Sequence, residues 1–407
     1  MTTTINKEQK NPNVPNLRFP EFEGEWKRHS LTDFMSFKNG MNPDAKRFGT
    51  GTKFISVMDI LNNQYICYDN IRASVELQDG DIEAYGVNYG DILFQRSSET
   101  LEDIGRANVY LDSKPAIFGG FVIRGKSKDN YNPLFFRYLL ASPTARKRII
   151  VKGAGAQHFN IGQDALSKVF IDIPTLKEQK KIGKLLQCLD ERIATQNKII
   201  EDLKKLKSAI SKQVFAQEPN GWSRLDTLFS KGKAGGTPTS TNKEYYNGEI
   251  PFLSINDITK QGKYVRYTEN HLSQSGLENS SAWVVPKYSL IMSMYASVGL
   301  VTINEIPITT SQAMFAMQLK DKDLLDYLYY YLSYFKYRHI HKYLETGTQS
   351  NINADIVRGI MIPTYGHSRN MEIASTLQGI DVKIDNELSV LKLFNRQKNY
   401  LLSQMFI

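Results

Sequence analysis

The sequence predicts an α+β fold in which two similar mixed α/β domains are separated by two long antiparallel coiled-coil helices, as a pseudo-two-fold internal repeat. Three observations predict this fold class. The second half of the 407-residue chain restates the first half at an offset near 190 residues. Each copy ends in a long segment whose apolar residues step by four and by three. Ahead of that segment, each copy shows the alternation of apolar and polar residues that is typical of strands.

The composition indicates a globular chain of two or three domains, with 41% apolar and 23% charged residues. The formal net charge of +9 attracts phosphates, anionic lipids or acidic partners. Two cysteines without a CxxC motif favour a reducing compartment over a disulfide scaffold or a zinc site. Because the N-terminus lacks an apolar signal segment and no run reaches about 18 apolar residues, we expect a cytoplasmic protein without a membrane partner.

Matched segments make the repeat visible. KFISVMDI (53–60) and PFLSINDI (251–258) both alternate, as a half-buried strand leading into a turn would. Two later segments of each copy are helical in period and rich in aromatic residues, at 133–149 and 324–340. A loop with glycine and glutamine then precedes each long helical segment.

The two long helical segments match in phase. Their apolar stripes are coiled-coil seams, and polar residues interrupt both seams at the same two places, Gln196 and Lys207 in the first and Glu387 and Lys398 in the second. The central seam residues are Leu189, Ile193, Gln196, Ile200, Leu203 and Lys207 in the first helix, and Ile384, Glu387, Leu391, Phe394, Lys398 and Leu401 in the second, where Ile384 corresponds to Ile193 at an offset of 191.

Antiparallel pairing of the seams would bring the polar interruptions together. We expect Gln196 to face Lys398 and Lys207 to face Glu387, with apolar residues opposite each other elsewhere. Buried polar pairs of this kind set the register more than they add stability.

Five segments follow from this pattern. AQEPNG (216–221) is the clearest boundary, because proline and Asn-Gly stop a helix. The predicted segments are a lead-in at 1–20, a first mixed domain at 21–175, a helix at 176–217, a second mixed domain at 218–364 and a second helix at 365–407.

Catalytic motifs are missing from the sequence. There is no GxxxxGK[ST] phosphate loop, no [DNS]PP[YFW] methyltransferase motif, and no HExxH or clustered Cys/His pattern for a metal. We therefore expect a chain that is not an enzyme and that has no catalytic, cofactor or metal residues of its own.

The loop before each long helix carries candidate DNA contacts. A protein that reads DNA needs cations for phosphates, and amide or guanidinium groups for base edges. A plain turn before a strand is the alternative interpretation, and the two stay open. The candidates are Lys152, Gln157, His158 and Asn160 in the first loop, and Gln349, Ser350, Asn351 and Asn353 in the second.

Other repeated places add candidates. Arg96 is the best one for guanine, and Tyr295 fits a core position better than an aromatic contact. The basic runs 145–152 and 335–342 fit either a solvated helix face or phosphate contact, and their repetition favours phosphate. The remaining candidates are Ser97 and Arg106 in the first copy and Thr237, Ser293, Ser311 and Gln312 in the second.

The sequence resembles the DNA specificity (S) subunit of type I restriction-modification enzymes. The resemblance covers essentially the whole chain and rests on PNLRFPEFEGEW (15–26), IPTLKEQKKIGKLLQCLDERI (173–193) and GWSRLDTLFSKGKAGGTPT (221–239). It implies two target-recognition domains, each of which reads half of a split site in double-stranded DNA. Since the loops differ between the copies, the site should be asymmetric.

The resemblance also implies partners. Conserved helices would set the separation of the half-sites and bind two modification (methyltransferase) subunits, which carry S-adenosylmethionine. Restriction subunits, the ATP-dependent translocase and nuclease, would complete the complex. IPTYGHSRNMEI (362–373) lacks the Glu-Gln pair of the first helix start, so identical partner contacts at both helix starts are in doubt.

Two rival classes remain open from the sequence. A cytoplasmic coiled-coil scaffold with protein-binding globular domains would assemble without DNA and without sensitivity to salt. A nuclease or methyltransferase of a new type would act on DNA as the purified chain alone.

Overall fold

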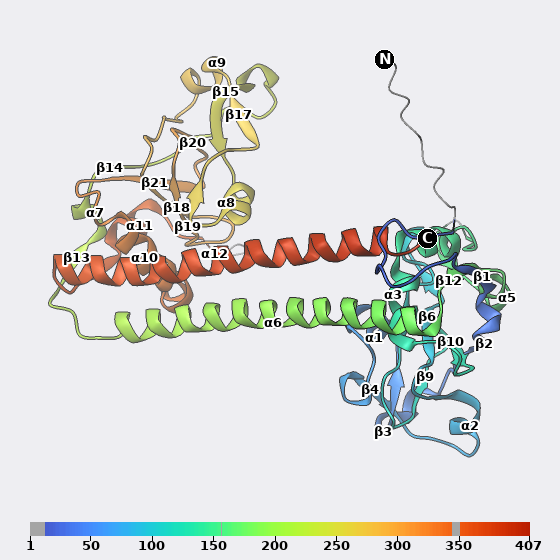
Figure 1. The fold of residues 1–407 in the computed structure, drawn as a ribbon. Coiled ribbons are helices and arrows are strands. Elements are labelled where there is room, and N and C mark those ends of the chain that lie inside the picture. The colour runs from blue at the N-terminus through green and yellow to red at the C-terminus, as the bar shows by residue number, and fades with distance from the viewer. Residues whose placement is uncertain (1–12, 156, 344–350) are drawn as a thin grey trace, which may run out of the picture. The chain divides into compact units, whose positions relative to one another are not determined.

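A computed structural model of the chain describes residues 13–155, 157–343 and 351–407. The chain divides into two compact units, unit 1 with Met1–Asn197 and Ser389–Ile407, and unit 2 with Lys198–Leu388. Each unit therefore contains one globular domain and a part of each long helix (Figure 1). Among the described residues, no helix is both long and apolar enough to cross a membrane.

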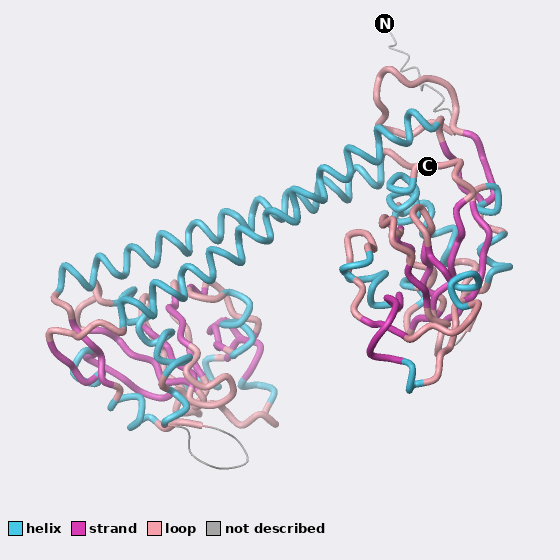
Figure 2. The backbone as a smooth tube through the Cα atoms, turned by 90° about the horizontal axis from the view of Figure 1, so that it is seen from below, coloured by secondary structure: helices cyan, strands magenta, loops and turns pink. Residues whose placement is uncertain are grey.

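Unit 1 is built on two four-stranded sheets, with its strands gathered together and its shorter helices around them (Figure 2). The first sheet is antiparallel, in the order β2 (Met35–Asn39), β10 (Val122–Ser127), β6 (Ile92–Gln95) and β8 (Ala107–Val109). The second has the order β4 (Ala73–Val75), β3 (Phe48–Ile55), β9 (Ala116–Phe118) and β5 (Gly86–Val87), with β3 parallel to β9.

Short elements complete unit 1. Two antiparallel strand pairs are β1 (Lys27–Ser30) with β12 (Phe170–Ile173), and β7 (Ser97–Ser98) with β11 (Phe159–Asn160). The helices are α1 (Val57–Asn62), α2 (Asp81–Tyr85), α3 (Pro133–Ala141), α4 (Pro143–Ile150) and α5 (Gln163–Ser167).

Unit 2 repeats the central part of this topology, with differences at the sheet edges. Its antiparallel sheet has the order β14 (Phe229–Ala234), β21 (Met314–Leu319), β18 (Leu290–Ser293) and β19 (Val301–Asn304), and β16 (Tyr264–Val265) extends it in parallel. The second sheet is β17 (Asn270–Leu272), β15 (Tyr246–Leu253) and β20 (Thr309–Thr310), and β13 (Gly221–Arg224) pairs with β22 (Met361–Thr364). The helices are α7 (Leu225–Leu228), α8 (Ile255–Gln261), α9 (Gln274–Glu278), α10 (Leu325–Arg338) and α11 (Ala354–Gly359).

The matched segments 53–60 and 251–258 differ from their prediction. Each begins as a strand, but a helix follows where we expected a turn. The reason is a capping box, in which the backbone N–H of Ser56 donates to Asp59 at 2.7 Å and that of Ser254 donates to Asp257 at 2.8 Å. The same local motif therefore starts α1 and α8 at equivalent places.

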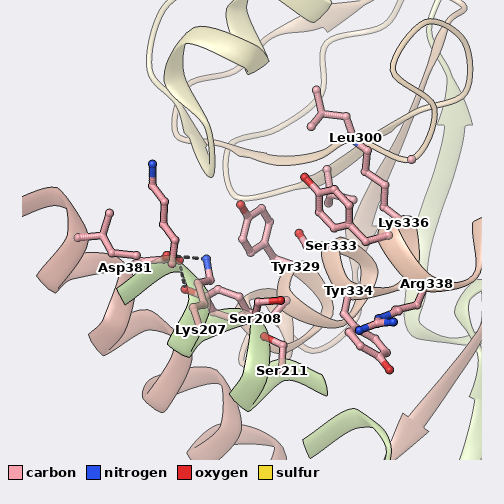
Figure 3. Close-up of a pocket in the computed structure, with 16 residues that line it drawn as sticks. Lys207, Ser208, Ser211, Leu300, Tyr329, Ser333, Tyr334, Lys336, Arg338 and Asp381 are labelled. Atoms are coloured by element: carbon pink, nitrogen blue, oxygen red, sulfur yellow. Dashed lines mark hydrogen bonds and ion pairs between the residues drawn. The ribbon is translucent and has the colours of Figure 1, made fainter. Parts of the chain in front are cut away.

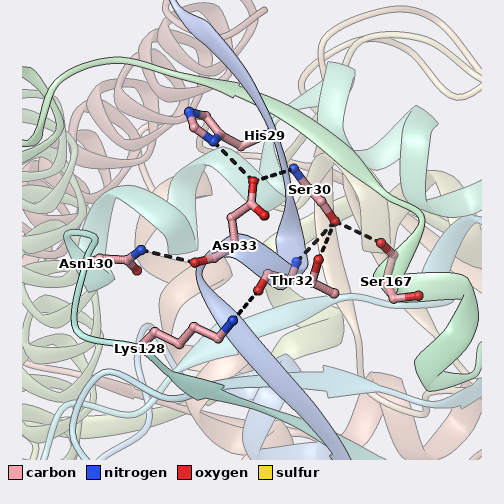
Figure 4. A network of polar contacts seen from close by, with 7 residues as sticks. All are labelled: His29, Ser30, Thr32, Asp33, Lys128, Asn130 and Ser167. Atoms are coloured by element: carbon pink, nitrogen blue, oxygen red, sulfur yellow. Dashed lines mark hydrogen bonds and ion pairs between the residues drawn. The ribbon is translucent and has the colours of Figure 1, made fainter.

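A polar network fixes the first strand of unit 1 against two distant segments (Figure 4). The hydroxyl of Ser30 donates to the carbonyl of Ser167 at 2.9 Å. From the other side, the Lys128 ammonium donates to the carbonyl of Thr32 at 2.6 Å, and the Asn130 amide donates to that of Asp33 at 3.1 Å. These bonds satisfy the backbone carbonyls of Thr32, Asp33 and Ser167, which lie outside the strand ladders.

The two long helices are α6 (Leu176–Phe215) and α12 (His367–Gln404), close to the predicted segments. The seam residues are buried or half-buried, whereas Leu206, Val382 and Leu393 on other faces are at least half exposed. The apolar stripes of the sequence are thus the buried faces of both helices.

Within each unit, the parts of α6 and α12 run antiparallel. In unit 1, the Lys398 ammonium of α12 pairs with Asp190 of α6 at 2.6 Å. The end of α12 lies by the start of α6, and the lead-in segment contacts both: the backbone N–H of Leu17 donates to the carbonyl of Gln404 at 2.9 Å, and Arg18 pairs with Glu178 at 2.8 Å. In unit 2, Lys207 pairs with Asp381 at 2.5 Å, and the Tyr365 hydroxyl donates to the carbonyl of Gln217 at 3.3 Å.

The predicted partners of the polar interruptions are wrong. Lys398 pairs with Asp190 and Lys207 with Asp381, whereas Glu387 accepts an ion pair from Lys383 at 2.5 Å on its own helix. For Lys398 the predicted partner was a neutral amide, and a carboxylate stabilises a partly buried ammonium better. For Lys207 the predicted partner was also a carboxylate, so its pairing with Asp381 reflects a register of the two helices that differs from the predicted one.

Candidate nucleic-acid interface

In unit 1 the structure brings three predicted residues together at the short β7–β11 pair. Asn160 lies opposite Ser97 in the ladder, and their side chains are hydrogen-bonded. The backbone of Arg96 accepts from Ile161 at 2.9 Å and donates to Phe121 at 2.9 Å. Arg96, Ser97 and Asn160 therefore form one polar surface, with the Arg96 guanidinium held by the carbonyl of Gly120 at 3.2 Å.

The loop that leads into this surface presents exposed side chains. Lys152, Gln157 and His158 are all exposed. Gly155 has a φ of 135°, and a Cβ at this position would lie 2.1 Å from the carbonyl oxygen of His158. The chain can make this close approach only because residue 155 is a glycine.

The side chain of Arg106 does not join the surface formed by Arg96, Ser97 and Asn160. Its guanidinium pairs with Asp103 at 2.7 Å, and the residue lines a cavity together with Arg137 and Arg146. Its backbone carbonyl still accepts from Gln95, the residue before Arg96, at 2.8 Å.

In unit 2 a second polar surface forms around Thr237, whose side chain is hydrogen-bonded to that of Gln312. Gln312 is exposed and Ser311 is half-buried. The backbone N–H of Gly236 donates to the carbonyl of Thr310 at 2.9 Å, which fixes the loop after β14 beside the turn between β20 and β21.

Tyr295 and Asn351 occupy the places that Ser97 and Asn160 have in unit 1. The carbonyl of Met294 accepts from Ile352 at 3.0 Å, as that of Arg96 accepts from Ile161. Tyr295 is 42% exposed, so it is not a core residue, which the sequence had favoured. The next two residues, Ala296 and Ser297, both have positive φ (38° and 56°), a strained conformation that is common at functional sites.

Some candidates do not contribute to these surfaces. Ser293 is completely buried, and its hydroxyl donates to the carbonyl of Ser297 at 2.7 Å, so we remove it from the interface. The Asn353 side chain caps α11 by accepting from two backbone N–H groups at 3.0 and 2.9 Å. Gln349 and Ser350 lie outside the described residues.

The basic run 145–152 is only partly available to phosphate. Arg148 pairs with Asp172 at 2.8 Å, and Arg146 donates to the carbonyls of Glu102 and Ile104. Lys147 and Lys152 are exposed. The run therefore combines structural cations with two that face solvent.

Sequence analysis missed two residues of the unit 1 surface. Phe121 is 68% exposed beside Arg96, and Asn42 lies so close to Gly120 that a Cβ there would meet its amide. Both line a hollow of about 380 Å³ that also includes the exposed Met58. Aligning NGMN (39–42) with AGGT (234–237) would have found Asn42, because Gly40 and Gly235 make the same close backbone approach.

Neither unit presents a metal cluster within the described ranges. Cys67 is half-buried and Cys188 is exposed, and both are free thiols. The chemistry available at the two surfaces is hydrogen bonding, charge and apolar contact, which is the chemistry of DNA reading.

Comparison with known families identifies the chain. The model of the type I restriction modification DNA specificity domain matches it twice, at residues 23–205 and 219–391. The chain belongs to this family, and it is a DNA-binding specificity subunit of a type I restriction-modification system. The two matches coincide with the two copies of the internal repeat.

One known relative agrees over nearly the full length, and another over a shorter part. A Methanocaldococcus jannaschii protein, provisionally named the MjaX type I restriction enzyme specificity subunit, is 25% identical over 92% of this chain and 91% of its own length. The HindI specificity subunit of Haemophilus influenzae is 32% identical over 27% of the chain. In fold, the S subunit of the type I system from M. genitalium matches with a TM-score of 0.58 at 15% identity, over 97% of this chain and 99% of that one.

Proposed function

We propose that this chain reads a bipartite, asymmetric DNA site, one half with each unit, and docks two modification subunits of a type I restriction-modification complex. The observation that carries the proposal is the duplicated surface beside β6 and β18, where the same backbone bonds present Arg96, Ser97 and Asn160 in unit 1 and Tyr295 and Asn351 in unit 2. Because the backbone arrangement is the same in both units but the side chains that it presents differ, the two units fit two different half-sites.

We expect three kinds of contact with each half-site: hydrogen bonds to base edges, apolar contacts to bases and ionic contacts to phosphates. In unit 1, Arg96 and Asn160 offer donors to base edges, and Phe121 and Met58 offer apolar contact to a thymine methyl group. In unit 2, Gln312, Thr237 and Asn351 offer amides and a hydroxyl but no guanidinium. Exposed lysines such as Lys152 and Lys147 supply phosphate contacts.

Partners follow from the family. The modification subunits would carry S-adenosylmethionine, and the restriction subunits would supply ATP-dependent translocation and cleavage, while this chain supplies the sequence specificity. Family membership favours this function over the coiled-coil scaffold that the sequence left open.

The helices α6 and α12 would set the number of base pairs between the half-sites. Inserting one heptad in each helix, after Gln196 and after Glu387, should lengthen the preferred spacer while both half-sites stay the same. Duplexes of varied spacer length, tested for binding by the assembled complex, measure this. An unchanged spacer preference in a folded insertion variant contradicts the role of the helices.

Exchange of one unit gives the matched test of the bipartite site. Replacing residues 21–175 with those of another specificity subunit should change one half of the methylated motif in cells. Replacing 218–364 should change the other half. A variant in which both halves change together contradicts the assignment of one half-site to each unit.

A further inference from the structure

A cationic pocket lies in unit 2, where α10 meets α6 and α12 (Figure 3). Its volume is about 420 Å³. Tyr329, Tyr330 and Tyr334 line it from α10, and Lys207 and Ser208 line it from α6. None of these residues belongs to the proposed DNA-reading surfaces.

Charge in this pocket is unbalanced. Four cations line it, Lys204, Lys207, Lys336 and Arg338, against one carboxylate, Asp381, which pairs with Lys207. Lys336 is half-buried and has no carboxylate partner among the described residues. Burial lowers the pKa of Lys336, because its charge is poorly solvated, and a bound anion would reverse that effect.

Unit 1 has a pocket at the equivalent place, with a volume of about 460 Å³, in which Arg106, Arg137, Arg146 and Lys398 stand against one carboxylate, Glu102. Lys398, Asn399 and Leu402 of α12 line it, each 191 residues after Lys207, Ser208 and Ser211. The domain side matches as well, since Tyr138 and Arg146 correspond to Tyr330 and Arg338. The recurring members are one tyrosine, one arginine and one lysine.

Unit 1 also holds guanidinium groups with unsatisfied donors. Nε of Arg137 and Nη1 of Arg146 are buried and have no hydrogen-bond partner. Burial, followed by the nearby charge of Arg106, lowers the pKa of Arg146 to about 10. Buried donors without partners are rare in proteins, and here they lie with Arg106 and Lys398 around one cavity.

We propose that each unit carries a phosphate-binding pocket where its domain meets the helix pair, built on Lys207, Lys336 and Arg338 in unit 2 and on Lys398, Arg106 and Arg146 in unit 1. Phosphate fits because its oxygens accept from donors that converge from several directions. The pockets differ from the DNA-reading surfaces, so a free phosphate ligand would go beyond the proposed function, whereas a DNA phosphate would deepen it and rests on it. The phosphate is either a free phosphate ligand or a phosphate of the DNA backbone.

Binding of pyrophosphate to the full chain, followed by isothermal titration calorimetry, tests the first source. We expect two sites per chain. Lys336→Gln should weaken one of them by about tenfold and Arg106→Gln should weaken the other, because each removes one cation from a pocket. The matched controls, Lys322→Gln and Lys184→Gln, remove exposed charges outside the pockets and should leave both sites intact.

Salt dependence of binding to a specific duplex tests the second source. If a backbone phosphate fills the unit 2 pocket, Arg338→Gln should lower the slope of log K against log salt by about one, whereas Lys322→Gln should not. Either result, pyrophosphate binding or this change of slope, supports the pocket.

Two results would overturn the proposal. One is that the pocket variants bind pyrophosphate as tightly as the control variants do, and also bind the duplex as tightly as the controls do. The other is a loss of modification-subunit assembly in the pocket variants with no change towards pyrophosphate or duplex, because the pockets would then accept carboxylates of a protein partner. Far-ultraviolet circular dichroism of each variant checks that the chain is folded.

Discussion

The starts of the two long helices differ between the two units. At the start of α6, Glu178 is 1% exposed and accepts from Arg18 through both of its oxygens. At the equivalent place in α12, Arg369 is exposed and pairs with Glu372, one turn further along. The comparison teaches that a buried ion pair holds the lead-in segment against the start of α6, whereas the ion pair given by the described residues at the start of α12 is exposed.

In the first turn of the two long helices, one buried amide side chain has the same role in both units. The side chain of Gln179 accepts from the backbone N–H of Asn132 at 3.0 Å, and Asn370, 191 residues later, accepts from that of Tyr365 at 3.0 Å. Both side chains are almost completely buried. The Glu-Gln pair of the first copy therefore has internal partners, and its loss in the second copy is compensated by a shorter amide.

The two units agree most closely at a buried polar node. In unit 1, Asp190 accepts from the hydroxyl of Tyr138 at 2.9 Å and pairs with Lys398. In unit 2, Asp381 accepts from Tyr330 at 2.8 Å and pairs with Lys207. The helices exchange roles, so that each contributes the aspartate in one unit and the lysine in the other.

The largest effect that we expect comes from the difference at the helix starts. Glu178→Gln should lower the free energy of unfolding of unit 1 by about 3 kcal/mol, because it leaves the largely buried Arg18 without a counter-charge. Asn370→Ala should lower that of unit 2 by about 1 kcal/mol, the value of a neutral hydrogen bond. Hydrogen exchange measured separately for the two units, with Glu372→Gln as the exposed control, makes the comparison. Equal losses would remove the distinction between the two helix starts.

A smaller effect tests the shared node. Asp190→Asn should destabilise unit 1 by about 2 kcal/mol, and Asp381→Asn should destabilise unit 2 by about 1 kcal/mol. Asp190 should cost more because its side chain is 5% exposed against 24% for Asp381, and because Arg137 also contacts it at 3.3 Å. Urea unfolding followed by hydrogen exchange gives both values. A larger loss at Asp381 would contradict the order that burial predicts.

The smallest effect concerns DNA. Arg96→Ala and Gln312→Ala should each weaken binding by about 1 kcal/mol, and each should relax specificity in one half-site only. Competition between duplexes altered in one half or the other, at fixed salt, measures this. Lys322→Gln serves as the charge control. Relaxed specificity in both halves by either variant would show that the two surfaces do not read separately.

Several features could be predicted from the sequence because they depend on local pattern. The repeat, the two long helices and the buried stripe that includes Leu189 and Leu401 follow from periodicity, which a helix converts directly into a face. The capping boxes at Ser56 and Ser254 were also visible as Ser-x-x-Asp, but the alternation around them favoured a turn and hid two helix starts.

The candidate site could be predicted only in part. The pairing of Ser97 with Asn160 depends on a ladder between segments 63 residues apart in the chain, and the role of Asn42 depends on a close backbone approach to Gly120. Ser293 lies between Met292 and Met294, and this alternation predicts an exposed serine; because all three residues are buried in the structure, its burial could not be anticipated from the pattern.

By itself, the sequence determined that this protein is a tandem of two like domains, each followed by an amphipathic helix, because repetition and periodicity are written residue by residue. Only the tertiary structure decided that the seam lysines pair with Asp190 and Asp381. An ion pair depends on which side chains can meet after packing, and a lysine can reach several positions along a neighbouring helix. For the same reason, the two cationic pockets exist only where α10, or α3 and α4, meet the helix pair.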